Sequence, residues 1–320
     1  MDRFRPFRNG DPPALVELWN GALPDVGAAR PLGVHEFDTL VMGRLDFDPQ
    51  GFIVAERDGH PVGFAHAGFG PAEPDGPSHR PDTELGTVAM LVVEPGPDRA
   101  DLERELLRRA EEYLRARGAE VLYAGGCYPL NPFYWGLYGG SEFAGILGSH
   151  ECFRRAVEAA GYVATGQAVL WEADLTIPEV RDPKGPLLRR ITRVEVADDA
   201  FLDSWWDALA LGPFRPTKYR LVSKIDDAPL ARAMTWEMLG YRRDGRCRTG
   251  LLDLEVEPSQ RRKGYGRHLV AEILRHARSQ MTEVVEVQTA ATNAAAMALY
   301  ESAGFTRVET ATLYRLGQRA

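Results

Sequence analysis

Residues 251–267 read LLDLEVEPSQRRKGYGR, and this stretch decides the expected fold. Its first part is largely apolar up to Val256 and stops at Pro258, which is typical of a strand that enters a turn. Its second part is basic and contains two glycines, and residues 268–281 then place apolar side chains at helical spacing. Such a turn aims unpaired backbone N–H groups at one point, at the positive end of a helix dipole. We therefore predict a polyphosphate site surrounded by four cations: Arg261, Arg262, Lys263 and Arg267.

The spacing of the glycines distinguishes between the known phosphate-binding loops. The P-loop needs four residues between its glycines and then Lys-Ser/Thr, and the dinucleotide fingerprint needs Gly or Ala where this chain has Leu269. What remains is R-x-x-G-x-G after a strand that ends V-x-P. This pattern resembles motif A of the GNAT superfamily of N-acetyltransferases, with Arg261, Gly264 and Gly266 at the matching positions. Taken alone, the motif is equally compatible with an ordinary loop.

The residues that follow strengthen the resemblance. A β-branched strand over 283–289 leads to an asparagine, a short helix over 294–303 and a last strand over 306–316. The GNAT family has the same order, with an Asn after its fifth strand and a helix that ends L-Y-x-x-x-G-F. The matching residues are Asn293, Leu299, Tyr300, Gly304 and Phe305. Residues 187–320 are thus identified as a member of this family.

The resemblance implies acetyl transfer from acetyl-CoA to an amine. An uncharged amine, a polarised thioester carbonyl and a proton for the leaving thiolate are required. By resemblance, Tyr300 is the general acid, and the strand end pairs its backbone with the pantetheine amides. The cofactor-binding residues that follow from the resemblance are Leu254, Val256, Arg261, Arg262, Lys263, Gly264, Tyr265, Gly266, Arg267 and Asn293.

The general base has two candidates on the same strand. Asp253 and Glu255 share one face because side chains alternate along a strand. We favour Glu255, which lies nearer the expected end of strand pairing, although either carboxylate could simply face solvent. Positioning alone can carry much of this reaction, so the assignment does not depend on a base.

Composition limits the class of protein. The 320 residues are 44% hydrophobic and 26% charged, which predicts a globular protein of about two domains. There is no membrane-spanning run or signal segment, so a cytoplasmic protein is expected. Cys127, Cys152 and Cys247 form no C-x-x-C pair, so neither a metal site nor a disulfide framework is indicated. A net charge of −8 argues against nucleic-acid binding and suits a cationic, small-molecule amine acceptor. Whether the chain forms a homodimer stays open.

The N-terminal half repeats the order of elements. It is expected to contain a helix over 12–21 with Asp11 as its N-cap, a hairpin over 51–70, a strand over 85–93 and a helix over 100–117. A shift of 163 positions places Val93 on Val256. The same shift places Asp101 on Gly264 and Glu103 on Gly266. Because these carboxylates would repel a pyrophosphate, we expect the first domain to have lost its cofactor loop.

We therefore predict an α/β fold of two tandem GNAT-like domains, each a mixed, mostly antiparallel sheet flanked by helices. The expected boundaries are 1–176, a linker over 177–186 and 187–320. The second domain should open with a strand over 187–196 and a helix that contains Trp205 and Trp206.

Residues 125–148 form an insertion, rich in aromatic residues and glycine, that the second domain lacks. It is expected to be either a packed structural loop or contact between domains, or a wall of the substrate pocket. The tandem layout is similar to that of mycothiol synthase, but this similarity of layout does not imply the same substrate. The alternatives are a catalytically silent acetyl-CoA-binding module, another acyl-CoA donor, or an oxygen or protein acceptor.

Overall fold

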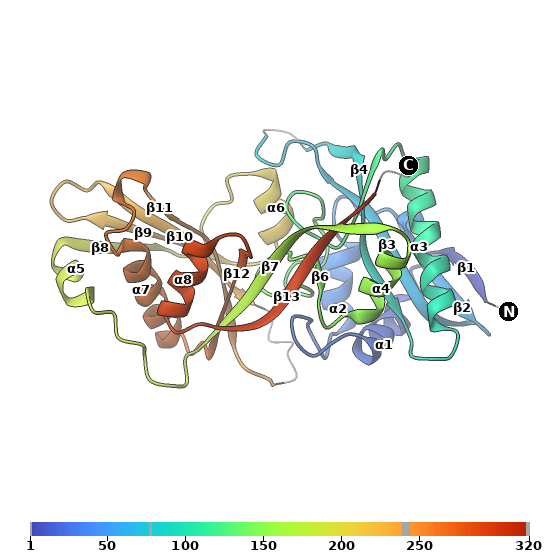
Figure 1. Cartoon of the computed structure of the whole chain (residues 1–320), viewed down its shortest axis with the longest axis horizontal. Helices are drawn as coiled ribbons and strands as arrows, with labels where there is room; N and C mark the ends of the chain where they lie inside the picture. The colour runs from blue at the N-terminus through green and yellow to red at the C-terminus, as the bar shows by residue number, and fades with distance from the viewer. Residues whose placement is uncertain (1, 77–78, 239–243, 318–320) are drawn as a thin grey trace.

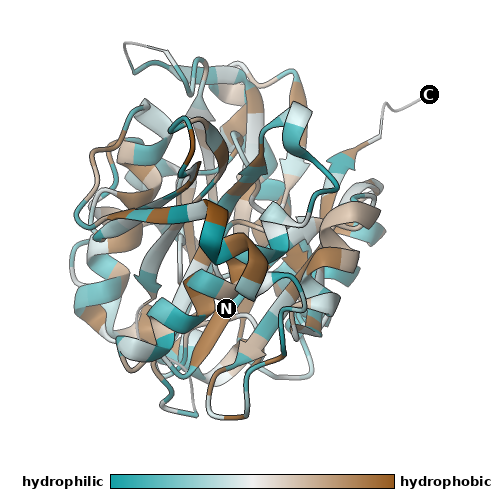
Figure 2. Ribbon diagram, turned by 90° about the vertical axis from the view of Figure 1, so that its left-hand side faces the viewer, coloured by the Kyte–Doolittle hydropathy of each residue, from teal (hydrophilic) through white to brown (hydrophobic). Residues whose placement is uncertain are grey.

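The computed structural model describes residues 2–76, 79–238 and 244–317. Thirteen strands form one continuous mixed sheet, whose path runs β1-β2-β3-β4-β5-β13-β7-β12-β11-β10-β9-β8, with β6 paired to β13 (Figure 1). Helices cover both faces of this sheet, and Figure 2 shows that they carry both apolar and polar segments. No helix within the described ranges is long and apolar enough to cross a membrane.

The first half contains the elements expected from the sequence. Its helices are α1 (Pro12–Ala22), α2 (Val34–Phe37), α3 (Arg99–Ala116) and α4 (Glu151–Ala159), with a π-helical turn at Asp38–Met42 and a 3-10 turn at Pro49–Gly51. Its strands are β1 (Arg3–Pro6), β2 (Phe52–Arg57), β3 (His60–Pro71), β4 (Pro81–Val93), β5 (Val121–Ala124), β6 (Ile146–Leu147) and β7 (Tyr162–Asp174). Asp11 occupies the N-cap position of α1 but does not cap it with its side chain. Its carboxylate instead pairs with buried Arg5 at 2.8 Å, because an unpaired buried guanidinium would be costly.

The second half differs from expectation at its start. The strand expected over 187–196 is wrong for its first part, where α5 (Gly185–Ile191) begins with a proline in its first turn, a position that favours helix. Strand β8 (Thr192–Ala197) follows. The expected helix is α6 (Trp205–Leu211). The sequence also predicts a basic hairpin turn over 242–248, around Asp244-Gly245, and this turn lies partly outside the described residues. The remaining elements are β9 (Pro216–Ser223), β10 (Pro229–Met238), β11 (Arg248–Val256), a 3-10 turn (Pro258–Gln260), α7 (Tyr265–Ser279), β12 (Val284–Ala290), α8 (Ala294–Ser302) and β13 (Thr306–Leu316).

The pairing register confirms the internal repeat. Parallel strands β4 and β5 pair up to Val88 and Ala124, and parallel strands β11 and β12 pair up to Leu251 and Val287. Both partners are offset by the 163 positions expected from the sequence. In each half the outer antiparallel neighbour also has a register shift close to this point. The two halves are therefore copies of one strand arrangement.

The last strand of each half is exchanged with the other half. Strand β7 of the first half lies between β12 and β13, and β13 at the end of the chain pairs with β5 and β7. Figure 1 shows the two strands side by side through the middle of the molecule. The sequence does not reveal this exchange, since both strands have the same apolar pattern wherever they pair. The boundaries at 176 and 187 stay a prediction.

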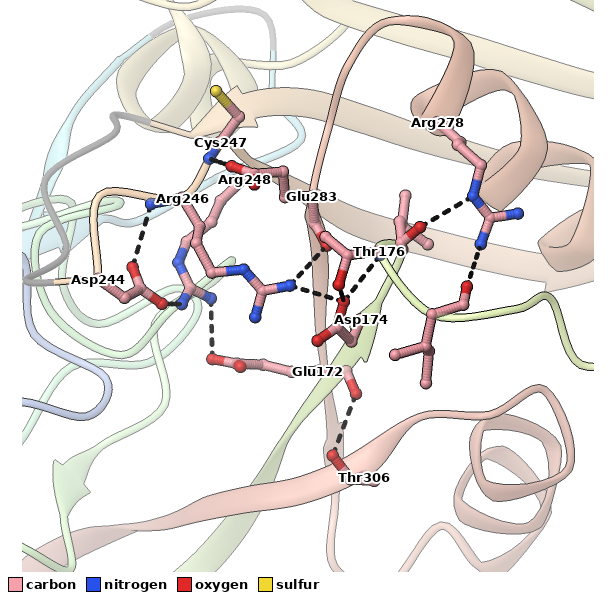
Figure 3. A network of polar contacts seen from close by, with 12 residues as sticks. Glu172, Asp174, Thr176, Asp244, Arg246, Cys247, Arg248, Arg278, Glu283 and Thr306 are labelled. Carbon is pink, nitrogen blue, oxygen red and sulfur yellow. Dashed lines mark hydrogen bonds and ion pairs between the residues drawn. The ribbon is translucent and has the colours of Figure 1, made fainter.

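A buried ionic network joins β7 to the second half (Figure 3). Arg248 at the start of β11 has a side chain that is only 5% exposed, and it contacts Glu172 at 2.9 Å, Glu286 at 2.8 Å and Asp244 at 2.6 Å. Glu172 comes from the first half of the chain. The Arg248 guanidinium therefore links β7 of the first half to β11 and β12 of the second half.

Replacing Arg248 by methionine is expected to destabilise the fold by about 3–5 kcal/mol, because it removes a buried cation from Glu286, whose side chain is only 8% exposed. The matched control is Arg246→Met. Arg246 also pairs with β7, through Asp174 at 2.7 Å, but its side chain is 27% exposed and a loss nearer 1 kcal/mol is expected. Urea denaturation of both variants measures the difference. Equal losses would contradict the special role of Arg248.

Candidate active site

Strands β11 and β12 separate at the centre of the second half. Their pairing ends at Leu251, whereas β11 continues to Val256 and β12 to Ala290. Asp253 adopts a φ of +53°, and the register with β10 shifts between Arg232 and Met234. This bulge bends β11 away from its parallel neighbour. The backbone of residues 252–256 therefore has no β12 partner and can accept an extended ligand as an added strand.

The cationic turn follows directly and ends at the start of α7. Arg262 and Gly264 have φ values of +62° and +98°, so Gly264 supplies a left-handed conformation that glycine adopts without strain. A Cβ on Gly266 would lie 3.0 Å from Leu299 and 3.1 Å from Val256. The first three amides of α7, at 265–267, have no earlier helical carbonyl to bind. The turn thus combines free N–H groups with a close approach of backbone.

Cationic side chains surround this turn. Arg261, Arg262 and Lys263 are exposed, Tyr265 is half-buried, and Arg267 donates to the Arg181 carbonyl at 3.2 Å. A fifth cation was not expected from the sequence: the Lys184 side chain from the segment before α5 lies 3.2 Å from the Cβ position of Gly264. No motif could have identified Lys184, because only the path of this segment across α7 brings it there.

Tyr300 is buried on α8 beneath the separated strands. It is 5% exposed and packs against Phe305 and against Trp171 of β7, with ring centroids 5.4 Å and 6.4 Å away. Burial, with a smaller contribution from the Glu142 carboxylate, raises the pKa of Tyr300. The phenol therefore keeps its proton at neutral pH. Asn293, expected at the cofactor, caps α8 by accepting a hydrogen bond from the Ala296 amide at 3.1 Å.

A cavity of about 1040 Å³ opens beside β11, and both halves line it. The first half contributes aromatic side chains of the insertion, which pack against α6 and β10. Three cations line the cavity, and each is already paired with a carboxylate: Lys218 with Asp203, Arg220 with Glu195 and Arg232 with Glu255. Seven carboxylates line it: Asp75, Glu142, Asp203, Asp207, Asp253, Glu255 and Glu257. The cavity is therefore acidic and suits a cationic molecule.

The two base candidates differ in their surroundings. Glu255 accepts two hydrogen bonds from Arg232, at 2.9 and 2.6 Å. Desolvation, followed by the charge of Asp207, raises the pKa of Asp253. Both line the cavity, as does a third carboxylate, Glu142, which sequence reasoning missed. Only the tertiary path of the insertion reveals Glu142, since nothing in its local sequence distinguishes it.

The first half lacks the corresponding groups. Tyr300 lies four residues before Gly304, and the residue four before Gly161 is the buried Val157. At the start of α3, Asp101 pairs with Arg104 and Glu103 with Arg99, both at 2.8 Å. The insertion residues Phe133 and Tyr134 fill the core against β4. Within the described ranges, no group of His, Cys, Asp and Glu could hold a metal ion.

Comparisons with known proteins agree with this architecture. The model of the acetyltransferase (GNAT) family matches residues 13–139 and 188–305. A mycothiol acetyltransferase of Frankia alni is 37% identical over 95 residues, a match that spans 28% of each chain.

Solved structures share the fold along the whole chain. The glucosamine N-acetyltransferase region of a fungal multi-domain GH3 β-N-acetylglucosaminidase has a TM-score of 0.69 at 14% identity, over 98% of this chain and 38% of that one. A tandem GNAT protein from the clavulanic acid biosynthesis pathway covers 100% of both chains, with a TM-score of 0.67 and 14% identity. A GCN5-related N-acetyltransferase of Sphaerobacter thermophilus has a TM-score of 0.65 at 15% identity, over 98% and 95%. The chain belongs to the GNAT acetyltransferase family, in its tandem two-domain form.

Proposed function

We propose that this protein transfers the acetyl group of acetyl-CoA to a primary amine of a small molecule, and that the second half performs the chemistry. One observation carries the proposal. The separated strands, the cationic turn and a buried tyrosine occur together in the second half, whereas the first half has ion pairs and Val157 at the corresponding positions.

The residues of the second half suit the steps of this reaction. The α7 amides and the cations at 261–263 and 267 would bind the pyrophosphate. The backbone at Leu254 and Val256, which has no β12 partner, would bind the pantetheine amides and polarise the thioester carbonyl. Tyr300 would then donate its proton to the leaving thiolate, because its raised pKa keeps it protonated until that charge develops.

The acidic cavity favours an acceptor that carries positive charge. The name of one similar structure, a glucosamine N-acetyltransferase region, suggests amino sugars as one group to test. A suitable panel is glucosamine, a cysteinyl amine, lysine amide and spermidine. Release of free CoA thiol measures turnover.

The donor site is tested by isothermal titration of acetyl-CoA into the wild type and into the double variant Gly264→Asp, Gly266→Glu, which copies the first half. We expect one site per chain in the wild type and no binding in the variant. An added side chain would strain the left-handed Gly264 and crowd Leu299, and the carboxylates would repel the pyrophosphate.

The control is Asp101→Gly, Glu103→Gly, which should leave the single site unchanged. Binding that survives in the Gly264/Gly266 variant would place the donor site elsewhere. Binding without turnover of any amine would instead favour an acetyl-CoA-sensing module.

A further inference from the structure

The insertion from the first half holds a carboxylate rigidly at the site of the second half. Trp236 of β10 donates its indole N–H to the Ser141 carbonyl at 3.1 Å. Gln288 of β12 donates to the Glu142 carbonyl at 2.7 Å and also to the Gly139 carbonyl. Gln288 lies beyond the last β11–β12 pair, at the open edge of β12. The backbone on both sides of the Glu142 Cα is therefore fixed at the point where the strands separate.

The Glu142 side chain lies on the cavity wall. It lines the same cavity as Asp253 and Leu254, the bulged part of β11 whose backbone is free. The flanking Phe143 is buried against Trp135 and Trp206, with ring centroids 4.9 and 5.7 Å away. These ring contacts hold the backbone next to Glu142 in place at the cavity wall.

On these contacts, and resting on the proposed function, we propose that Glu142 is the general base of the second half, contributed by the first half. In the step, the amine nitrogen attacks the thioester carbonyl, so that a C–N bond forms and the C–S bond breaks. Glu142 accepts the proton that the nitrogen loses, and Tyr300 gives its proton to the thiolate. The products are the N-acetyl amine and free CoA, and proton exchange with solvent restores Glu142 and Tyr300.

The charges around Glu142 suit a base that works near neutral pH. Burial raises the pKa of Glu142 to about 8, and the nearby Asp253 adds to this effect. The charge of Asp253 on β11 acts on Glu142, and Glu142 in turn acts on Tyr300 of α8. The other charged groups that line the same cavity are Asp75 before β4, Asp203 before α6, Asp207 on α6, Lys218 and Arg220 on β9, Arg232 on β10, Glu255 on β11 and Glu257 after it. Glu286 on β12 lies beside Gly140, two residues before Glu142. The three cavity cations Lys218, Arg220 and Arg232 are paired with Asp203, Glu195 and Glu255, respectively, and Glu286 is paired with Arg248. In contrast to Glu255, Glu142 is thus a poor ion-pair partner and a strong proton acceptor.

The test compares pH profiles of kcat/KM for the wild type, Glu142→Gln, Glu142→Asp and Glu255→Gln, with glucosamine and spermidine as acceptors. In the wild type, log kcat/KM should rise with pH to about 8 for both amines. Glu142→Gln should lower kcat about 10²–10⁴-fold and abolish that rise, with acetyl-CoA affinity unchanged. Glu142→Asp should restore part of the rate and the rise. Glu255→Gln is compared for the pH-dependent rise alone, which it should retain if Glu142 is the base.

A second readout needs no acceptor. A carboxyl whose pKa is raised on folding costs stability once the pH exceeds its unfolded value, and the full cost is present above the folded value. Glu142→Gln should therefore melt at a higher temperature than the wild type at pH 8.5, and the difference should vanish near pH 4. If Glu142 were a carboxylate that stabilises the fold, Glu142→Gln would instead melt at a lower temperature than the wild type at pH 8.5.

Each outcome is decisive. Wild-type kcat/KM and pH profile in Glu142→Gln would overturn the inference, as would loss of the pH-dependent rise in Glu255→Gln alone. A rise that follows the basicity of the amine and persists in Glu142→Gln would also overturn it. These results leave the proposed function standing, whereas a wild type that acetylates no amine of the panel would overturn both.

Discussion

Replacing Tyr300 by phenylalanine is expected to lower kcat by about 10²–10⁴-fold, which is the usual contribution of a general acid. The ring stays in place against Trp171 and Phe305, so only the hydroxyl is lost. The proton that it holds at neutral pH is then missing when the thiolate leaves. Steady-state release of CoA thiol, with calorimetry of acetyl-CoA binding, separates this loss from a loss of affinity.

The matched control is Tyr138→Phe in the first half. Tyr138 is also buried, and it binds His150 at 2.9 Å and the Leu147 amide at 3.0 Å. Its loss should cost stability of about 1 kcal/mol without lowering kcat. An unchanged rate in Tyr300→Phe, or a large loss in Tyr138→Phe, would place the acid elsewhere.

Neither half of the chain is expected to fold when it is produced alone. A fragment of residues 185–320 lacks β7, so β12 loses its antiparallel neighbour and β13 loses both β5 and β7. In a fragment of residues 1–176, β7 loses both of its neighbours. We expect the free energy lost with these strand pairings to exceed the net stability of a typical domain, which is only about 5–15 kcal/mol. Circular dichroism melts of each fragment should show no cooperative transition.

Production of both fragments in one cell should restore a two-chain complex that co-purifies and binds acetyl-CoA. The control pair carries residues 1–176 and 185–304, without β13, and should associate much more weakly, because β7 then pairs with β12 but lacks β13. A fragment of residues 185–320 that melts cooperatively as a monomer would show that the exchange contributes little.

The sequence predicts the second half well because local and global signals agree there. The glycines at 264 and 266 are required by a left-handed turn and a close approach, so their spacing specifies a structure. The strand predicted at 187–191 is wrong because the apolar residues of this segment suit a strand and a helix equally well, and Pro186 in the first turn favours the helix. The secondary structure of such short apolar segments is decided by the residues that flank them.

The remaining features depend on long-range geometry. Glu142 and Lys184 reach the site only through the paths of the insertion and of the segment before α5. Strand exchange is equally hidden, since β7 and β13 would have the same alternation in unexchanged domains. The spacing of apolar residues along a strand does not show which edge of a sheet that strand pairs with.

The exchange of strands also has a consequence for synthesis on the ribosome. A domain at the N-terminus usually folds while the rest of the chain is still being made. Here β5 pairs with β4 of its own half, but it obtains its second neighbour only from residues 314–315, which are translated well after it. The nascent first half must wait with an open sheet edge, which invites chaperone binding. A product truncated anywhere before β13 leaves both halves incomplete, so premature termination would be recognised as misfolding and not released as a partly working enzyme.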